Sequence, residues 1–528
     1  MTALAPVDSD IIARLQSILG PENVITDDVE RRYFAEDVYT AGTPPLAVLR
    51  PGTVDELAQA VAAATEAGLA VFPRGGGMSY TSGYLPTTPQ SVTVDLLRMN
   101  KVREINLDDM YVTVECGCSW ADLHEALKDH GVRPPFWGSL SGIHATVGGG
   151  LSQNAAFFGT GQYGSAADSV IGLEVVLADG RAVTTGSGAV RGGTPFFRHY
   201  GPDLTGLFTA DAGALGIKAV ATLKLIADPP EKRFASFNFA TYEKMAAAMA
   251  EIGRRGLASE CFGFDPFLQA QRMKRESLMK DVKSLAGVMK AAGSVRAALK
   301  EGAKLAVAGR GYMKDVAFSC HVITEHKSAA AADAALAEIN QVACAAGGEE
   351  IENSIPKIIS ANPFTPLNNM IGPDGERWVP VHGIVPYSRV AQVTAAVEAL
   401  FAANKSAMET HGIETGYLFA NVGQSAMIIE PVFFWPDALM GFHHRHVEDH
   451  VLKKVTQRDE NLAARQAVDE LKSALATLLM EQGAVHFQIG KFYRYKDGLA
   501  PESYALVKAL KQVVDPKGLM NPGALGLE

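Results

Sequence analysis

The stretch that decides the fold is Val71-Phe-Pro-Arg-Gly-Gly-Gly-Met-Ser-Tyr-Thr-Ser-Gly-Tyr-Leu-Pro86. In it, an apolar strand end runs into three successive glycines, Gly75 to Gly77. Glycine tolerates positive φ and has no Cβ to obstruct a ligand, so the backbone N–H groups of such a turn can converge on a phosphate. Arg74 adds a fixed positive charge. The stretch predicts an anion-binding nest; the alternative interpretation is an ordinary glycine-rich surface loop.

A second glycine-rich stretch lies farther along the chain. It runs Gly138-Ser-Leu-Ser-Gly-Ile-His-Ala-Thr-Val-Gly-Gly-Gly-Leu-Ser-Gln-Asn-Ala-Ala-Phe-Phe-Gly159 and continues as Gly161-Gln-Tyr-Gly164. An apolar strand then ends in the turn signal Ala178-Asp-Gly180. Two separate glycine nests are suited to a long ligand that carries two phosphates.

Taken in order, these stretches resemble the vanillyl-alcohol oxidase / p-cresol methylhydroxylase superfamily of flavoproteins, which also contains D-lactate dehydrogenase and glycolate oxidase flavoproteins. The resemblance covers nearly the whole chain. It includes Gly206-Leu-Phe-Thr-Ala-Asp-Ala-Gly-Ala-Leu-Gly-Ile217 and ends with Val514-Asp-Pro-Lys-Gly-Leu-Met-Asn-Pro-Gly523. It implies an FAD-dependent oxidoreductase, but none of these motifs specifies the substrate.

The composition is that of a globular protein with more than one domain. Its 528 residues are 47% hydrophobic and 20% charged. Five cysteines in so long a chain exclude a disulfide scaffold, and Cys116 and Cys118 in a strand-like run favour core packing over a metal pair. A net charge of −10 argues against nonspecific nucleic-acid binding.

The sequence also gives an expectation about location. The first ten residues contain neither the basic region nor the apolar core of a signal peptide. The chain has no run of about eighteen apolar residues that would span a membrane. We therefore expect a cytoplasmic protein.

Short helices and strands alternate along the chain, which predicts an α+β fold. Helices are expected over 8–20, 53–67 and 119–130. Strands are expected near 47–50, 92–96 and 111–115, with a strand, turn and strand over 417–435. The glycine loops do not follow the Gly-x-Gly-x-x-Gly pattern of a Rossmann unit.

The resemblance implies two units within this α+β chain. One is a two-subdomain FAD-binding domain of the vanillyl-alcohol oxidase type over residues 1–228, to which residues 488–528 return. The other is a cap domain on an antiparallel sheet over residues 229–487. Pro229-Pro230 marks the boundary, since the composition beyond it shifts toward Ala, Lys and Met.

The resemblance also implies which residues contact FAD. The implied set is Pro73, Arg74, Gly75, Gly76, Gly77, Met78, Ser79, Ser139, Gly142, Thr146, Gly148, Gly149, Asn154, Gly164, Gly216, Ile217, His382 and Asn521. Several members of the superfamily attach FAD covalently through a His or Tyr of the cap, and His382 lies near that position. Non-covalent binding is the alternative.

Flavoproteins of this kind take a hydride from a substrate C–H bond, while the protein orients the substrate and stabilises the developing charge. By resemblance to vanillyl-alcohol oxidase, Tyr80, Tyr493 and Arg494 fall where that family binds a phenolate oxygen. Two hydroxyls and a guanidinium would lower the pKa of a substrate phenol. This predicts oxidation of a para-substituted phenol or an aryl alcohol. The alternative is that Tyr493 and Arg494 only line the flavin edge or a carboxylate site.

The chain departs from both branches of the superfamily. Vanillyl-alcohol oxidase has an acidic residue near the flavin at the position of Ser165, which makes Ser165 a candidate catalytic position with altered chemistry. The metal site of the D-lactate dehydrogenase branch would fall near Asn421, Ile428 and Val485, leaving only His486. No metal is therefore expected.

The alternative function is a D-2-hydroxy-acid dehydrogenase of the lactate or glycolate type. There Arg494 or Lys491 would bind the substrate carboxylate and His486 would act as the base. Lys491 could equally neutralise charge on reduced flavin, and His144 is expected to pack near the FAD pyrophosphate.

Two further features allow more than one interpretation. The histidines His443, His444, His446 and His450 have helical spacing that could suit zinc, although no complete ligand set is obvious. The basic segment 272–314 is either a solvated amphipathic cap helix or a docking surface for anionic lipid or an acidic electron acceptor. The acceptor of electrons would be oxygen, a carrier protein or a quinone, and the resemblance implies a homodimer.

Overall fold

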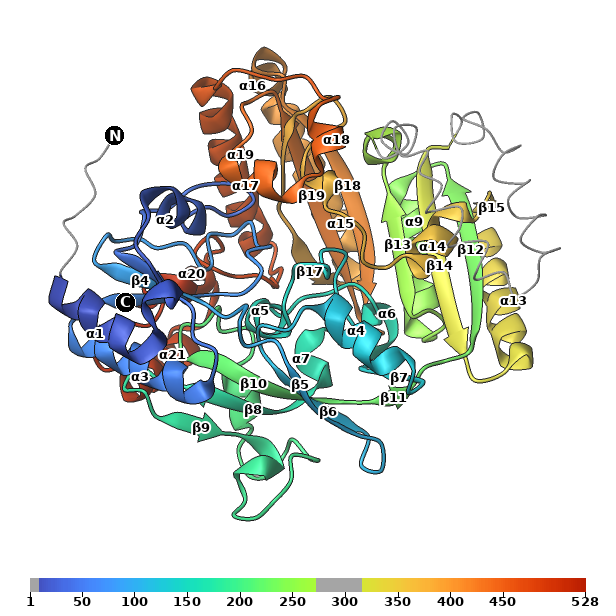
Figure 1. Cartoon of the computed structure of the whole chain (residues 1–528). Helices are drawn as coiled ribbons and strands as arrows, with labels where there is room; N and C mark the ends of the chain where they lie inside the picture. The colour runs from blue at the N-terminus through green and yellow to red at the C-terminus, as the bar shows by residue number, and fades with distance from the viewer. Residues whose placement is uncertain (1–8, 272–315) are drawn as a thin grey trace.

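A computed structural model describes residues 9–271 and 316–528 (Figure 1). Helices and mainly antiparallel sheets alternate along this part of the chain, which confirms the predicted α+β class. The basic segment 272–314 lies outside the described residues. No described helix has the length and apolar character needed to cross a membrane. The cytoplasmic location and the homodimer stay predictions.

The first sheet follows directly from the predicted strands near the N-terminus. Its strand order is β1 (Val24–Ile25), β2 (Ala47–Leu49), β4 (Ser91–Asp95) and β3 (Ala70–Arg74). Strands β2, β4 and β3 are parallel, and α3 (Val54–Glu66) makes the crossover between β2 and β3. Helix α1 (Ser9–Leu19) packs on α3, and α2 (Asp28–Phe34) precedes β2.

The second sheet is antiparallel and lies beside the first (Figure 1). Its order is β5 (Val102–Asn106), β6 (Tyr111–Glu115), β10 (Ile217–Lys224), β8 (Val170–Val176) and β9 (Ala182–Thr184). Its helices are α4 (Trp120–Lys128), α5 (Val147–Gln153), α6 (Thr160–Tyr163), α7 (Ala166–Ser169) and α8 (Leu204–Leu207). A separate ribbon pairs β7 (Val132–Arg133) with β11 (Ile226–Ala227).

The third sheet is the largest and is antiparallel throughout. Its order is β15 (Glu349–Glu350), β12 (Glu231–Phe239), β14 (Phe318–His326), β13 (Glu260–Phe264), β18 (Glu414–Val422), β19 (Ala426–Trp435) and β16 (Arg377–Pro380), with β17 (Gly383–Pro386) also on β19. We call this the cap sheet. The change of sheet near Glu231 is compatible with a boundary at Pro229-Pro230, although the domain limits stay predictions.

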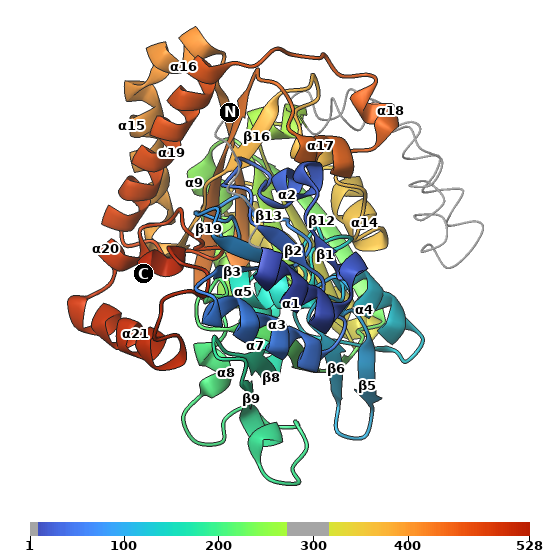
Figure 2. The same cartoon turned by 60° about the vertical axis from the view of Figure 1, so that its left-hand side comes forward.

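Helices cover the cap sheet, mostly on one face. Figure 2 shows α15 (Val390–Ala403), α16 (Lys405–His411) and α19 (Leu462–Glu481) as one layer beside β19. Helices α9 (Tyr242–Arg254) and α13 (Ala329–Ala345) pack on β12 and β14. The remaining helices are α14 (Ser354–Ala361), α17 (Gly441–His446), α18 (Asp449–Leu452), α20 (Tyr495–Gly498) and α21 (Pro501–Val514). Short 3-10 helices occupy Pro21–Asn23, Gly186–Ala189, Asn368–Met370, Tyr387–Arg389 and Ala524–Gly526.

The C-terminal motif returns to the first sheet. The Val71 N–H donates to the Leu519 carbonyl at 2.8 Å, and the Asn521 N–H donates to the Val71 carbonyl at 2.9 Å. Met520 therefore lies alongside β3 in parallel register. This pairing fixes the end of the chain next to the glycine loop that follows β3.

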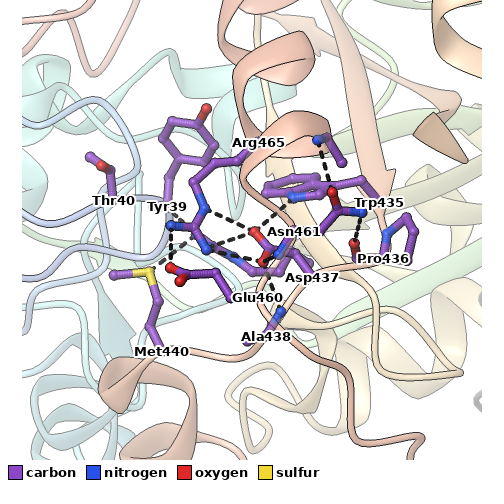
Figure 3. Close-up of polar contacts among 12 residues, drawn as sticks. Tyr39, Thr40, Trp435, Pro436, Asp437, Ala438, Met440, Glu460, Asn461 and Arg465 are labelled. Atoms are coloured by element: carbon purple, nitrogen blue, oxygen red, sulfur yellow. Dashed lines mark hydrogen bonds and ion pairs between the residues drawn. The ribbon is translucent and has the colours of Figure 1, made fainter. Parts of the chain in front are cut away.

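A buried ion-pair network around Asp437 joins the cap sheet to the N-terminal segment (Figure 3). Asp437 has no exposed surface and accepts hydrogen bonds from the Arg465 guanidinium at 2.9 and 3.0 Å and from the Trp435 indole at 3.2 Å. Burial acts to raise the pKa of Asp437, but the hydrogen bonds from Arg465, the Asn461 N–H and Trp435 together with the charge of Arg377 hold the pKa below its usual range. Arg377 lies 3.4 Å from the same carboxylate and donates to the Tyr39 carbonyl.

This ion-pair network predicts that Asp437→Asn strongly lowers the free energy of unfolding. The amide keeps the shape of the side chain but leaves the buried Arg377 without a counter-ion, so we expect the free energy of unfolding to fall by about 3–5 kcal/mol. Chemical denaturation followed by tryptophan fluorescence measures it. Asp333→Asn is the matched control, because Asp333 pairs with Arg233 at the surface and exposed pairs contribute less than about 1 kcal/mol. Equal losses in the two variants would contradict the prediction.

Candidate active site

A cavity of about 690 Å³ lies between the glycine loops and the cap sheet. One end is formed by the loop after β3 and by α5. The other end is formed by β13, β18 and β19 of the cap sheet, with Trp378 and Phe487. A cavity of this size, partly apolar and lined by two glycine loops, can hold a large ligand together with a small one.

The glycine loop after β3 is pressed against the second glycine-rich stretch. A Cβ on Gly76 would lie 1.8 Å from the His144 carbonyl oxygen, and one on Gly75 would lie 2.2 Å from Thr146 Oγ1. Gly77 has φ +74°, which favours glycine. Thr146 in turn caps α5 by accepting a hydrogen bond from the Gly149 N–H at 3.1 Å. The loop lines the cavity, so the interpretation as an ordinary surface loop was wrong.

Most of the residues implied for FAD line this cavity. They are Pro73, Arg74, Gly75, Gly76, Gly77, Met78, Ser79, Ser139, Thr146, Gly148, Gly149, Gly216 and Ile217. The arrangement brings together stretches that are distant in sequence, and the backbone of both glycine loops borders the cavity wall.

The other implied FAD residues do not line the cavity but support its walls. Asn521 Nδ2 donates to the carbonyls of Ala212 and Gly83, the latter at 2.7 Å. Asn154 ends α5 in the left-handed region, with φ 51°, and Gly164 has φ +86°. Gly142 has no room for a Cβ beside Phe364. These positions shape the loops rather than face a ligand.

Unsatisfied polar atoms in the cavity wall indicate a missing ligand. Gln153 Oε1 and Asn421 Oδ1 are buried and have no hydrogen-bond partner among the described residues, yet both side chains line the cavity. Buried polar atoms in native proteins nearly always have a partner. The residues therefore fit a bound group with hydrogen-bonding edges, such as the one the glycine loops imply.

The cap-sheet end of the cavity is a mostly apolar face that carries the acidic residue Glu430 on β19. Strand register places Phe262 opposite Ala420, Ala420 opposite Ile428, and Leu418 opposite Glu430. Because side chains alternate along a strand, these residues share the face toward the cavity. Glu430 was not predicted as a site residue from the sequence, although an acidic residue inside the apolar strand 425–435 could have pointed to it.

Tyr80 lies opposite this acid. Its hydroxyl oxygen accepts a hydrogen bond from Gln488 Nε2 at 3.0 Å, and its ring packs edge-on against Trp378. Burial, followed by the nearby charge of Glu430, raises the pKa of Tyr80 well above its ordinary value. Tyr80 is therefore a neutral hydroxyl that faces the cavity and can donate a hydrogen bond.

Arg494 does not join Tyr80 as predicted, whereas Tyr493 lies near Tyr80. The Tyr493 hydroxyl accepts from the His382 N–H at 2.8 Å and lies outside the cavity wall. Arg494 points away, is exposed, and donates to Thr477 Oγ1 at 2.9 Å. The chain turns into α20 at Arg494, so neighbouring side chains face opposite directions. The structure thus brings the two phenols of the expected site near each other, but the guanidinium is elsewhere.

His486 and Ser165 also have other partners. His486 Nδ1 lies 2.7 Å from the His382 carbonyl oxygen, and its ring stacks on Tyr493. Burial lowers the pKa of His486 to about 4. Ser165 caps α7, and its N–H donates to the Asp168 carboxylate at 2.8 Å. Neither residue lines the cavity, so their predicted catalytic roles are not supported.

His382 is enclosed behind the cavity wall. Its Nε2 lies 2.6 Å from the Phe487 carbonyl oxygen and its Nδ1 lies 3.1 Å from the Tyr493 hydroxyl. Phe487, which does line the cavity, stacks on the imidazole with ring centroids 3.6 Å apart. Burial lowers the pKa of His382 to about 3. Both ring nitrogens are engaged, which disfavours a covalent bond to a cofactor.

The remaining candidates have structural partners. Lys491 Nζ donates to Asn521 Oδ1 at 2.6 Å and to the Gly83 carbonyl at 3.1 Å, and burial lowers its pKa to about 7. His446 Nε2 lies 2.9 Å from the Tyr33 hydroxyl, and His144 lines a separate cavity of about 410 Å³ behind the glycine loop. The described residues form no group of three or more His, Cys, Asp or Glu suited to a metal.

Comparison with known proteins finds FAD-linked families in two parts of the chain. Residues 45–186 match the FAD binding domain family, and residues 489–525 match the C-terminal domain of FAD linked oxidases. The chain is 31% identical over 255 residues to an uncharacterised FAD-linked oxidoreductase of Mycobacterium tuberculosis, a match of 48% of this chain and 53% of that protein. It is 31% identical over 252 residues to glycolate oxidase subunit GlcD of Bacillus subtilis, covering 47% and 50%. The matches span about half the length of these curated relatives.

Solved structures share the fold over the whole chain. The structure of p-cresol methylhydroxylase with substrate bound superposes with a TM-score of 0.74 at 17% identity, covering 98% of this chain and 96% of that chain. The 4-ethylphenol oxidase of Gulosibacter chungangensis superposes with a TM-score of 0.71 at 18% identity, covering 100% and 99%.

Gly76→Ala is predicted to impair FAD binding. The new Cβ cannot fit against the His144 backbone, so the glycine loop must shift, and we expect FAD affinity to fall by at least about tenfold, which corresponds to 1.4 kcal/mol. Titration of the apoprotein with FAD, followed by flavin fluorescence, measures it. Gly498→Ala is the control, because its Cβ would meet only the flexible Met480 side chain at 3.3 Å. Unchanged affinity in Gly76→Ala would contradict the prediction.

The surroundings of His382 predict that FAD is held non-covalently. Acid precipitation of the purified protein is expected to release the flavin into the supernatant, because neither ring nitrogen of His382 is free to bond to it. The measurement compares the flavin absorbance of supernatant and washed pellet. A pellet that keeps its yellow colour would overturn this expectation.

The same cofactor is indicated by the two glycine loops, by the cavity they share with the cap sheet and by the two family matches. The chain carries an FAD binding domain over residues 45–186 and the C-terminal domain of FAD linked oxidases over residues 489–525, its fold is that of p-cresol methylhydroxylase, and its cofactor is FAD.

Proposed function

We propose that this protein is an FAD-dependent oxidoreductase that oxidises a para-substituted phenol or an aryl alcohol. Bound FAD would supply the acceptor for a hydride taken from a substrate carbon. The observation that carries the proposal is the mostly apolar cap-sheet face, on which Glu430 lies opposite the hydroxyl of Tyr80.

The apolar side chains suit an aromatic ring. Phe262, Ile428, Phe434, Trp378 and Phe487 all line the cavity. Aromatic pairs gain from edge-to-face and offset contacts beyond the area they bury. A substrate ring held among them would be shielded from water, which strengthens the polar interactions at its ends.

Tyr80 and Glu430 are suited to a substrate with a neutral hydroxyl rather than to one that is already a phenolate. Gln488 donates to the Tyr80 oxygen, so the Tyr80 O–H remains available to donate to a substrate oxygen. Glu430 can accept the proton of that same substrate hydroxyl. A phenolate would need a cation here, and Arg494, which was expected to supply it, lies at the surface.

A D-2-hydroxy acid is the second candidate, favoured by the match to glycolate oxidase subunit GlcD. Its carboxylate needs a cation or several N–H donors. Among the described residues that line the cavity, the cationic side chains are Arg74 and Lys218, and both lie at the glycine-loop end. Lys218 is already paired with Asp211 at 2.6 Å. Oxygen, a carrier protein or a quinone stays the predicted electron acceptor.

Anaerobic bleaching of the flavin absorbance tests the proposal. We expect para-substituted phenols or aryl alcohols to bleach it and D-2-hydroxy acids not to, because the cap-sheet face is apolar and acidic. Tyr80→Phe should slow the bleaching by about 10- to 100-fold, the size of a lost hydrogen bond to a developing charge.

Tyr111→Phe is the matched control for that substitution. The Tyr111 hydroxyl donates to Glu104 on the second sheet, away from the cavity, so its removal should leave the rate unchanged. Bleaching by hydroxy acids alone would replace the aryl proposal with the second candidate.

A further inference from the structure

A second acid borders the cavity at the start of β13, an interior strand of the cap sheet. Glu260, the first residue of β13, lines the cavity and is only 4% exposed. Its Oε1 accepts a hydrogen bond from the Gly159 N–H at 2.7 Å, and its Oε2 accepts one from the Ser259 hydroxyl. A buried carboxyl at the wall of a closed cavity is costly unless it is partnered or protonated.

Glu260 is connected to a third carboxyl behind it. The Ser259 hydroxyl also hydrogen-bonds to Glu325 of β14, which is 6% exposed. Glu325 pairs with Lys232 at 2.9 Å and with Arg133 at 2.5 Å. These two cations hold Glu325 in its ionised form, and the Lys232 side chain is 28% exposed.

The surroundings shift the pKa values of Glu260 and Glu325 in opposite directions. Burial, followed by the charge of Glu325, raises the pKa of Glu260 to about 7. Burial opposes ionisation of Glu325 too, but Lys232 and Arg133 outweigh it and lower its pKa. The other titratable groups facing Glu260 are Tyr163 of α6 and, beyond Arg133, Asp228. Two neighbouring carboxyls whose pKa values differ in this way can have different roles, one as a proton acceptor and the other as an ionised partner.

Strand register places Glu260 at the far end of the cavity from Glu430. The pairs Phe262–Ala420 and Phe264–Leu418 lie between them, across two strand spacings, so their backbones are roughly 15 Å apart. A substrate with one oxygen beside Tyr80 and Glu430 and a second oxygen across an aromatic ring would direct that second oxygen toward Glu260.

We propose that Glu260 accepts the hydroxyl proton of a benzylic alcohol, with the Ser259 hydroxyl holding its carboxyl in place. Bound FAD would accept a hydride from the carbinol carbon, while the alcohol oxygen loses its proton to the Glu260 carboxylate and an aldehyde forms. Glu260 thus supplies from the cap sheet the acid that is absent at Ser165. The inference rests on the proposed aryl-alcohol activity.

Glu260→Gln tests the acceptor role. The amide keeps an oxygen for the Gly159 N–H but cannot take a proton. We expect anaerobic flavin reduction by 4-hydroxybenzyl alcohol to slow by at least about 100-fold and to lose its pH dependence near neutrality. Glu231→Gln, an exposed change on β12 of the same sheet, should leave both unchanged. A wild-type pH profile in Glu260→Gln would overturn the proposal.

Ser259 tests the positioning of Glu260 separately. Ser259→Ala removes the hydroxyl that donates to Glu260 and should slow reduction, while Ser259→Thr restores the hydroxyl and should recover most of the rate. A role for Ser259 in packing alone predicts the reverse, since alanine fits the fully buried site more easily than threonine. Equal rates in both variants would contradict the positioning role.

A measurement without substrate separates this inference from the proposed function. Infrared difference spectra of the holoenzyme between pH 6 and pH 8 should contain a carboxylic-acid band that is absent in Glu260→Gln. If aryl alcohols fail to reduce the wild-type flavin but this band is found, the aryl-alcohol activity is wrong while Glu260 remains a titrating group. If the band is missing, Glu260 is not the acceptor.

Discussion

The contact between the two glycine-rich stretches is the constraint on which the site depends. Gly75 and Gly76 touch Thr146 and the His144 carbonyl with no space for a side chain. This close approach brings the end of β3 onto the start of α5, and it leaves the backbone of both loops along one wall of the cavity. The C-terminal motif reinforces it, because Asn521 pairs with β3 and also hydrogen-bonds to the loop that follows.

The cap sheet completes the cavity and must be held at a fixed position over these loops. Buried carboxyls do this at two places. Asp437 connects the end of β19 with Arg377, which reaches the N-terminal segment, and Glu260 on the interior strand β13 accepts a hydrogen bond from the Gly159 N–H. Both carboxyls are buried, and a buried charge persists only when partners offset its desolvation. The same contacts therefore set the width of the cavity.

Local patterns were sufficient to predict the glycine loops, the helices α1, α3 and α4, and the α+β class, because turns and helix periodicity depend on neighbouring residues. The direction of single side chains was not predictable in this way. Tyr493 turns inward and Arg494 outward only because the chain enters α20 between them. Glu430 and Tyr80 line one cavity because the loop after β3 packs under the cap sheet, and no local pattern encodes a contact between segments so far apart in sequence.

The cap-sheet face explains how one FAD-binding scaffold can serve different substrates. The glycine loops constrain the cofactor end, whereas the substrate end is decided by which residues fall on the cavity side of β13, β18 and β19. Function then depends on a few side chains grafted on a shared fold. Here Glu260 and Glu430 sit at opposite ends of an apolar wall. A carboxylate substrate would meet repulsion at both ends, whereas a neutral substrate with two hydroxyls would find an acceptor at each.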